Sequence, residues 1–117
     1  MTTKDVIVNY FDALKQKKDW TSFLADDLVF TSFTSPVRQL SGKKAFLEGT
    51  KRFYSMIAAL EVRDVIVEGE KVCVLTHYEL QPPAGPQFTS DVAEIFKFKD
   101  GKIESFDIYF DSSPFPK

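Results

Sequence analysis

Apolar side chains near the start of the chain recur at the spacing of one helix face. They are Val6, Ile7, Tyr10, Phe11 and Leu14. Steps of one and three residues match the period of an α-helix with a single buried side. Thr2 or Thr3 can cap the start of this helix, and Asp5 lies in its first turn, where negative charge is stabilising. The pattern therefore predicts an amphipathic N-terminal helix.

A short second helix and a strand are predicted next. Asp19 is the expected N-cap of the helix, Asp26 and Asp27 end it, and residues 28–33 form the strand that follows. The buried side chains of the helix would be Trp20, Phe23 and Leu24.

A third helix is predicted after a loop that starts at Ser35 and Pro36, with Ser41 as its N-cap. Its buried face comprises Phe46, Leu47, Thr50, Phe53, Tyr54 and Ile57. Gly49 lies inside this helix and costs about 1 kcal/mol relative to alanine, unless another element packs closely there.

From residue 60 onward the pattern is that of strands. They are expected at 62–68, 71–80, 88–99 and 102–110, separated by a turn at 69–70, a proline-rich loop at 81–87 and a hairpin turn at 100–101. Strands joined consecutively in this way form an antiparallel meander. Helices that precede and pack against such a sheet are typical of the α+β class, and residues 1–117 are expected to form one domain.

Strand alternation places Glu94 on an apolar face. Along the strand at 88–99, one face carries Ser90, Val92, Glu94, Phe96 and Phe98. This Phe-rich face is the expected interior. Burial should raise the pKa of Glu94, which suits a general acid, a general base or a neutral hydrogen-bond donor. The alternative is a structural carboxyl group bonded to Tyr10 or Tyr54.

The strand at 71–80 has two possible orientations, because both of its faces begin apolar. One face comprises Cys73, Leu75, His77 and Glu79, and the other Val72, Val74, Thr76 and Tyr78. We expect the helices to cover one side of the sheet and a second copy of the chain to cover the other. The predicted outer face, and hence the predicted homodimer interface, comprises Val74, Thr76, Tyr78, Ile95 and Tyr109.

Composition points to an aromatic core or pocket and excludes several function classes. The chain has 12 Phe, 4 Tyr and one Trp, a net charge of −2 and no block of Lys or Arg. Aromatic rings suit the lining of a pocket, and nucleic-acid binding has no electrostatic support. One His, one Cys and scattered carboxylates do not form a convincing set of metal ligands, and the sequence has no phosphate-binding or dinucleotide-binding motif. We therefore expect no metal and no cofactor.

The expected location is the cytoplasm. Cys73 is the single cysteine, so no intramolecular disulfide can form. The N-terminus lacks a signal-peptide pattern, and no apolar stretch approaches the ~20 residues of a membrane span. We expect no membrane partner.

Six local strings, in their order and spacing, match a known superfamily. They are Tyr10-Phe11-Asp12-Ala13-Leu14, Ala25-Asp26-Asp27, Ser41-Gly42, Arg52-Phe53-Tyr54, Glu94-Ile95-Phe96-Lys97-Phe98 and Gly101-Lys102-Ile103. With the layout, they resemble the nuclear transport factor 2-like superfamily, in particular its SnoaL-like polyketide cyclase and ketosteroid isomerase relatives. The resemblance covers essentially the whole chain. It implies a strongly curved antiparallel sheet, a cone-shaped half-barrel around an internal pocket, usually dimeric through its outer face.

The same resemblance implies roles for individual residues. Tyr10 and Tyr54 match tyrosines at the isomerase pocket floor, and Glu94 matches the carboxylic acid that helps to hold the oxyanion. The residues matched to the pocket walls are Phe106, Ile108, Phe110, His77 and Glu79. Ser32 stands where the isomerase has its general-base aspartate. A serine cannot shuttle a proton between carbons without an activating base, so steroid isomerisation is disfavoured.

The sequence leaves three functions open. The first is a cofactor-free isomerase, cyclase, dehydratase or hydrolase of a small, mostly apolar molecule, with Glu94 and His77 transferring protons. The expected ligand pocket comprises Tyr10, Ser32, Tyr54, Leu75, Glu79, Phe96, Phe106, Ile108 and Phe110. The second is a non-catalytic protein that binds a ligand in the same pocket. The third is a dimeric interaction module whose pocket is filled by its own side chains.

Overall fold

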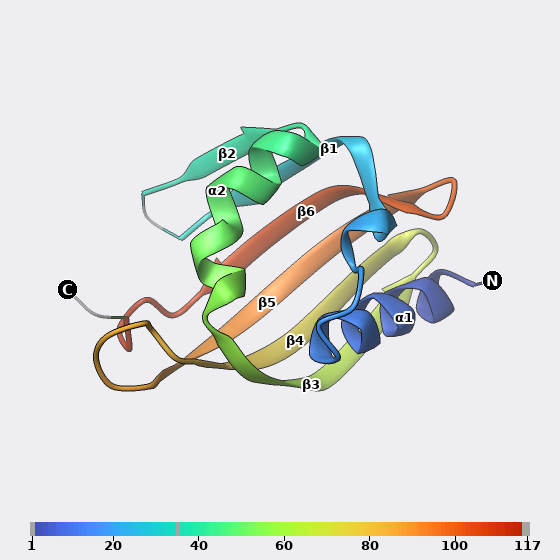
Figure 1. Ribbon diagram of the computed structural model, residues 1–117. Coiled ribbons are helices and arrows are strands. Elements are labelled where there is room, and N and C mark those ends of the chain that lie inside the picture. The colour runs from blue at the N-terminus through green and yellow to red at the C-terminus, as the bar shows by residue number, and fades with distance from the viewer. Residues whose placement is uncertain (1, 35, 116–117) are drawn as a thin grey trace.

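Two helices cover one side of a six-stranded sheet in the computed structural model, which describes residues 2–34 and 36–115 (Figure 1). The helices are α1 (Thr3–Lys15) and α2 (Lys43–Ser55). The strands are β1 (Leu24–Ser32), β2 (Arg38–Ser41), β3 (Ile57–Glu68), β4 (Lys71–Leu80), β5 (Phe88–Lys99) and β6 (Lys102–Phe110). These elements confirm the predicted α+β class. Neither helix has the length and hydropathy needed to cross a membrane.

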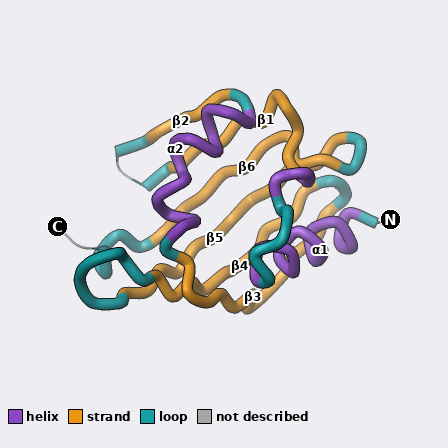
Figure 2. Tube along the Cα trace, viewed as in Figure 1, coloured by secondary structure: helices purple, strands orange, loops and turns teal. Residues whose placement is uncertain are grey.

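The sheet is curved, open and mixed. Its strand order is β2-β1-β6-β5-β4-β3, and β3 to β6 form the predicted antiparallel meander. Figure 2 shows the strands as one layer with both helices on the same side. The observed sheet differs from the predicted one in three respects. β1 runs parallel to β6, β2 forms within the expected loop, and β3 begins at Ile57, five residues before the expected start. The chain reaches β6 only after β2, α2 and the strands β3 to β5, and it then passes β1 in the same direction.

Helix α1 begins where the sequence predicts. The Thr2 hydroxyl accepts a hydrogen bond from the backbone N–H of Asp5 at 3.1 Å, and the Asp5 carboxylate accepts one from the N–H of Thr2 at 3.0 Å. This reciprocal capping satisfies two N–H groups that the helix itself leaves free. The predicted apolar face is buried in full: Val6, Ile7, Tyr10, Phe11 and Leu14.

The predicted second helix is wrong beyond one 3₁₀ turn, Thr21–Phe23. The Asp19 carboxylate accepts hydrogen bonds from the backbone N–H and the hydroxyl of Thr21, at 3.1 and 2.8 Å, which closes a local turn. Leu24 already pairs with Ile103 of β6, so the backbone is extended from that point. Asp26 and Asp27 therefore lie within β1 rather than at the end of a helix.

The start of α2 also differs from the prediction. Ser41 is the last residue of β2 and pairs with Val29, and Gly42 occupies the N-cap position without a side-chain hydrogen bond. Gly42 has a φ of +94°, a conformation that disfavours every residue with a Cβ atom. The predicted face of this helix extends too far, because Ile57 begins β3. A Cβ atom on Gly49 would lie 2.6 Å from a methyl group of Leu40, so β2 packs closely at this glycine.

The orientation of β4 is opposite to the one used for the predicted pocket. Its buried residues are Val72, Val74, Thr76, Tyr78 and Leu80. Directly opposed residues of two strands share a face, and the register pairs Val74 with Glu94 and His77 with Asp91. Val74, Thr76 and Tyr78 therefore belong to the interior and not to an outer interface. Leu75, His77 and Glu79 point outward instead.

An aromatic core anchors the helices to the sheet. The Phe96 ring is fully buried and lies 4.4 Å from the Phe106 ring and 5.7 Å from the Tyr10 ring, measured between centroids. Phe30 adds an edge contact to Phe106 at 5.3 Å. Such pairs each contribute about 0.5–1.5 kcal/mol beyond the burial of their area. This core fills one end of the concave side and leaves a cavity at the other.

Candidate functional site

The cavity lies between α2 and the concave side of the sheet. Its volume is about 280 Å³, close to the lower end of the range for small-molecule sites. Most of its wall is apolar, with Phe53 from α2, Val92 from β5 and Ile108 from β6 among the lining residues. Phe115, near the C-terminus, also lines the cavity. An unfilled apolar space of this size counts against an interaction module plugged by its own side chains.

Glu94 is the acidic residue of this wall. Its side chain is only 3% exposed, in the middle of β5. The Thr76 hydroxyl donates a hydrogen bond to Oε2 at 2.6 Å, and the Tyr78 hydroxyl lies 2.9 Å from Oε1 and 3.0 Å from Oε2. A carboxylate offers about four lone pairs, so two donors leave capacity for a ligand.

Two opposing effects set the pKa of Glu94. Burial among apolar side chains disfavours the charged form and is the larger effect. The hydrogen bonds from Thr76 and Tyr78 favour the charged form and oppose it. The result is a pKa of about 7 in place of 4.5. Near neutral pH both the acid and the carboxylate are populated, as proton transfer in either direction requires.

Tyr78 is the partner that strand alternation missed. The predicted alternatives were Tyr10 and Tyr54, and neither donates to Glu94 within the described part of the chain. Burial, with the nearby charge of Glu94, raises the pKa of all three tyrosines, so each is an uncharged phenol. Register was the missing signal: Val74 pairs with Glu94, and Thr76 and Tyr78 follow Val74 by two and four residues, so they face the same side as Glu94.

The remaining predicted pocket residues fall into three groups. Those that line the cavity are Ser32, Tyr54, Phe106, Ile108 and Phe110. Tyr10 and Phe96 are fully buried in the aromatic core behind it and do not line it. The Tyr10 hydroxyl lies near that of Tyr54 but makes no hydrogen bond of good geometry with any described residue. Leu75 and Glu79 are exposed on the opposite face of the sheet, so their predicted place in the pocket is wrong.

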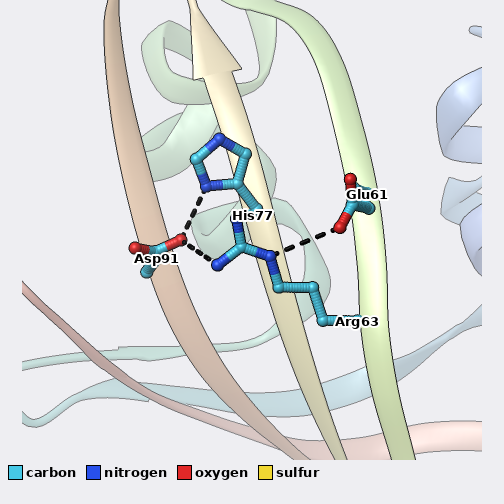
Figure 3. Close-up of polar contacts among 4 residues, drawn as sticks. All are labelled: Glu61, Arg63, His77 and Asp91. Atoms are coloured by element: carbon cyan, nitrogen blue, oxygen red, sulfur yellow. Dashed lines mark hydrogen bonds and ion pairs between the residues drawn. The ribbon is translucent and has the colours of Figure 1, made fainter.

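His77 does not meet Glu94. Its Nδ1 lies 2.6 Å from an oxygen of Asp91 on the outer face of the sheet, and Arg63 contacts the same oxygen at 3.2 Å (Figure 3). Arg63 also reaches Glu61 at 3.4 Å. The prediction that His77 supplies a second proton-transfer group to the pocket is therefore wrong. The Arg63 and Asp91 side chains are about half or more exposed, and such surface pairs contribute at most about 1 kcal/mol.

The wall of the cavity holds a single carboxyl group in the part of the chain that the structure describes, namely that of Glu94. Ser32 lies two strands away at the same level, since it pairs with Ile108, which pairs with Glu94. Within residues 2–34 and 36–115, no group of three or more His, Cys, Asp or Glu side chains is arranged to hold a metal ion.

Comparison with known proteins places this geometry in a family. A family model for the SnoaL-like domain matches residues 7–106. A comparison with curated protein sequences finds no match. The resemblance seen in the sequence is thereby confirmed for most of the chain.

Solved structures share the fold at low sequence identity. A protein from Kribbella flavida matches with a TM-score of 0.79 and 20% identity over 95% of this chain and 88% of that one. A SnoaL-like polyketide cyclase candidate from Shewanella denitrificans matches with a TM-score of 0.77 and 14% identity over 96% of this chain and 92% of that one. An LEH-like epoxide hydrolase from M. tuberculosis matches with a TM-score of 0.77 and 18% identity over 96% of this chain and 84% of that one. At such identities the likeness establishes the fold and leaves the reaction to the residues of the site.

Proposed function

Because the chain belongs to the SnoaL-like domain family, we propose that it binds a small, mostly apolar molecule in the concave cavity and moves a proton on that molecule through Glu94. The observation that carries the proposal is the placement of one buried carboxyl group, held by two hydroxyls, in the wall of an apolar cavity. The fold family includes cyclases, isomerases and an epoxide hydrolase, so family membership does not define the reaction. The residues of the cavity have to indicate which reaction this chain supports.

Each ionisation state of Glu94 has its own role in proton transfer. The protonated form donates its hydrogen to a carbonyl or hydroxyl oxygen of the ligand. The carboxylate accepts a hydrogen from a carbon next to a carbonyl group, or from a hydroxyl. A pKa of about 7 makes both forms available without a metal or a second base.

Thr76 and Tyr78 act on the carboxyl group itself. Their hydrogen bonds hold both oxygens in one orientation, so the group does not need to reorganise when its charge changes. They also keep its pKa from rising further. Tyr54 lines the cavity as an uncharged phenol and is the candidate donor to a ligand oxygen.

A reaction with one proton-transfer group is favoured by this set. In isomerisation, cyclisation or dehydration, the same carboxyl group can take a proton at one atom and return it at another. A mechanism with two carboxylates would need a second one on the wall, where the described residues present no carboxyl group besides that of Glu94. We therefore propose chemistry through an enol or enolate of an apolar carbonyl compound.

The test is proton exchange at a ketone that fits the cavity. We expect the wild-type protein to accelerate the exchange of the α-hydrogens of 2-tetralone with D₂O, followed by NMR. The rate should increase with pH up to about pH 7 and then level off, because the carboxylate is the active form. Glu94→Gln should lower the protein-dependent rate by about 100-fold or more, the range for loss of a general base.

His77→Ala is the matched control, since it removes a titratable side chain from the outer face. This variant should accelerate the α-hydrogen exchange of 2-tetralone as much as wild type does. Equal rates for wild type and Glu94→Gln would contradict the proposal. Binding of 2-tetralone without exchange would instead favour the non-catalytic binding protein.

We also propose that a second copy covers the outer face of the sheet. The apolar residues exposed there include Leu75 and Tyr109, which are 39% and 49% exposed, and Phe33, which stacks on Tyr109 at 5.0 Å. We expect a dimer by light scattering at micromolar concentration, and a monomer for Leu75→Glu, because a buried unpaired charge opposes association. Glu79→Gln on the same strand is the control. A monomeric wild type would rule this proposal out.

A further inference from the structure

We propose that Arg38 binds an anionic group of the ligand, such as a carboxylate, at the mouth of the cavity. The inference deepens the proposed function by naming the substrate class: an apolar body with a negative charge at one end and the reacting carbonyl or hydroxyl at the other. Arg38 is the first residue of β2 and lines the cavity with its neighbours Pro36 and Leu40.

The register of the sheet places Arg38 and Glu94 at the same level. Glu94 pairs with Ile108, Ile108 with Ser32, and Ser32 with Arg38. Residues directly opposed across strands point to the same side, so the side chains of this row all face the concave side. Three strand spacings separate the two ends by about 14 Å along the sheet. Both side chains line the same cavity, so a ligand that fills it can contact both ends of the row.

The charges of the wall are complementary to such a ligand. Among the described residues that line the cavity, Arg38 is the sole cation and Glu94 the sole acid. The Arg38 guanidinium makes no ion pair or hydrogen bond with any residue that the structure describes, whereas Arg63 is held by Glu61 and Asp91. A guanidinium group carries five N–H donors in a planar fork that matches a carboxylate. At the open end of an apolar cavity, these donors are available to a ligand.

A second polar group on the same wall also lacks a partner. The Ser90 hydroxyl is buried, with the residue 1% exposed, and no described residue hydrogen-bonds to it. Ser90 pairs with Tyr78 and lines the cavity. Buried polar groups are almost always satisfied in a functional state, by protein, water or ligand. A ligand with a polar atom near Ser90 would satisfy this hydroxyl, whereas an all-hydrocarbon ligand would leave it without a partner.

The location of the anion follows from the electrostatics of Glu94. A negative charge beside the buried carboxyl group would oppose its ionisation, so the anion is favoured at the Arg38 end and the reacting group at the Glu94 end. Arg38 thereby sets the direction in which the ligand enters. Its role is binding and orientation, and the proton transfer remains with Glu94.

A matched pair of dyes tests the inference. 1-Anilinonaphthalene-8-sulfonate carries an anion on an aromatic body, and N-phenyl-1-naphthylamine is the same body without the charge. We expect wild type to bind both in fluorescence titrations. Arg38→Gln should weaken the affinity for the sulfonate dye by about five- to twenty-fold, which is the effect of one charge-assisted contact that water still reaches. The affinity for the uncharged dye should change by less than about two-fold. Val92→Phe, which fills the cavity, should lower the affinity for both dyes.

Arg52→Gln is the charge-matched control, because Arg52 lies on the exposed side of α2 and does not line the cavity. It should leave both affinities unchanged. If Arg38→Gln changes the two affinities equally, or changes neither, Arg38 does not bind the anion. That outcome would leave the proposed function, tested with 2-tetralone, unaffected. Failure of both dyes to bind wild type, or insensitivity of both to Val92→Phe, would overturn the inference together with the proposed cavity.

Discussion

Raising the pH from 4.5 to about 8 should lower the free energy of unfolding of wild type by about 3 kcal/mol more than that of Glu94→Gln. The pKa of Glu94 rises from 4.5 to about 7 on folding. Well below pH 4.5 the carboxyl group is protonated in both the folded and the unfolded state, so it adds nothing to the pH dependence of the free energy of unfolding. Between 4.5 and about 7 the unfolded chain releases a proton that the folded chain retains, so stability falls as the pH rises. A shift of this size, at 1.36 kcal/mol per unit, corresponds to about 3 kcal/mol.

Urea denaturation at several pH values measures this difference. The curve for Glu94→Gln should lack the decrease, since its amide does not ionise. Glu68→Gln removes an exposed carboxyl group near the end of β3 and should follow wild type. If the wild-type and Glu94→Gln curves run parallel from pH 4.5 to 8, the carboxyl group is not desolvated, and the proton-transfer proposal loses its basis.

Phe96→Ala should destabilise the protein by about 3–5 kcal/mol, the range for truncating a buried phenylalanine. The ring is completely buried and contacts Phe106, Tyr10 and Phe11, with centroids at 4.4, 5.7 and 5.9 Å. Its removal leaves a hole where α1 meets the sheet. A loss of this size is a large part of the stability of a small domain, so much of the variant should be unfolded at 37 °C.

Thermal and urea denaturation check this expectation. Ile66→Ala is the comparison, because Ile66 is 56% exposed on β3, and its truncation should cost less than about 1 kcal/mol. Similar losses for the two variants would mean that Phe96 is not at the centre of the core.

Local pattern accounts for the elements that the sequence predicted well. The capping residues and apolar period of α1 lie within fifteen positions, and the turns that bound β4, β5 and β6 are marked by glycine or proline. The alternation along β5 was sufficient to place Glu94 among apolar side chains. Each of these signals depends on neighbours in the chain, so each can be interpreted without the rest of the fold.

The errors arose where distant pairing decides the outcome. The four residues of β2 carry no strand period of their own and are ordered by β1 and by contact with Gly49 of α2. On β4, both alternations begin apolar, and a shift of one residue exchanges the two faces. The pairing of β4 with β5 turned Tyr78 inward and His77 outward. For this reason the sequence pattern by itself places His77 on the wrong face.

The sequence by itself determined the class of the fold, the order and turns of the meander and the burial of one acid, because periodicity and turn residues are local properties. Tertiary structure alone decided which hydroxyls hold that acid, that Arg38 shares its row, and that a cavity remains beside the aromatic core. Those features depend on register and curvature across five strands, and no segment of the chain carries that information separately.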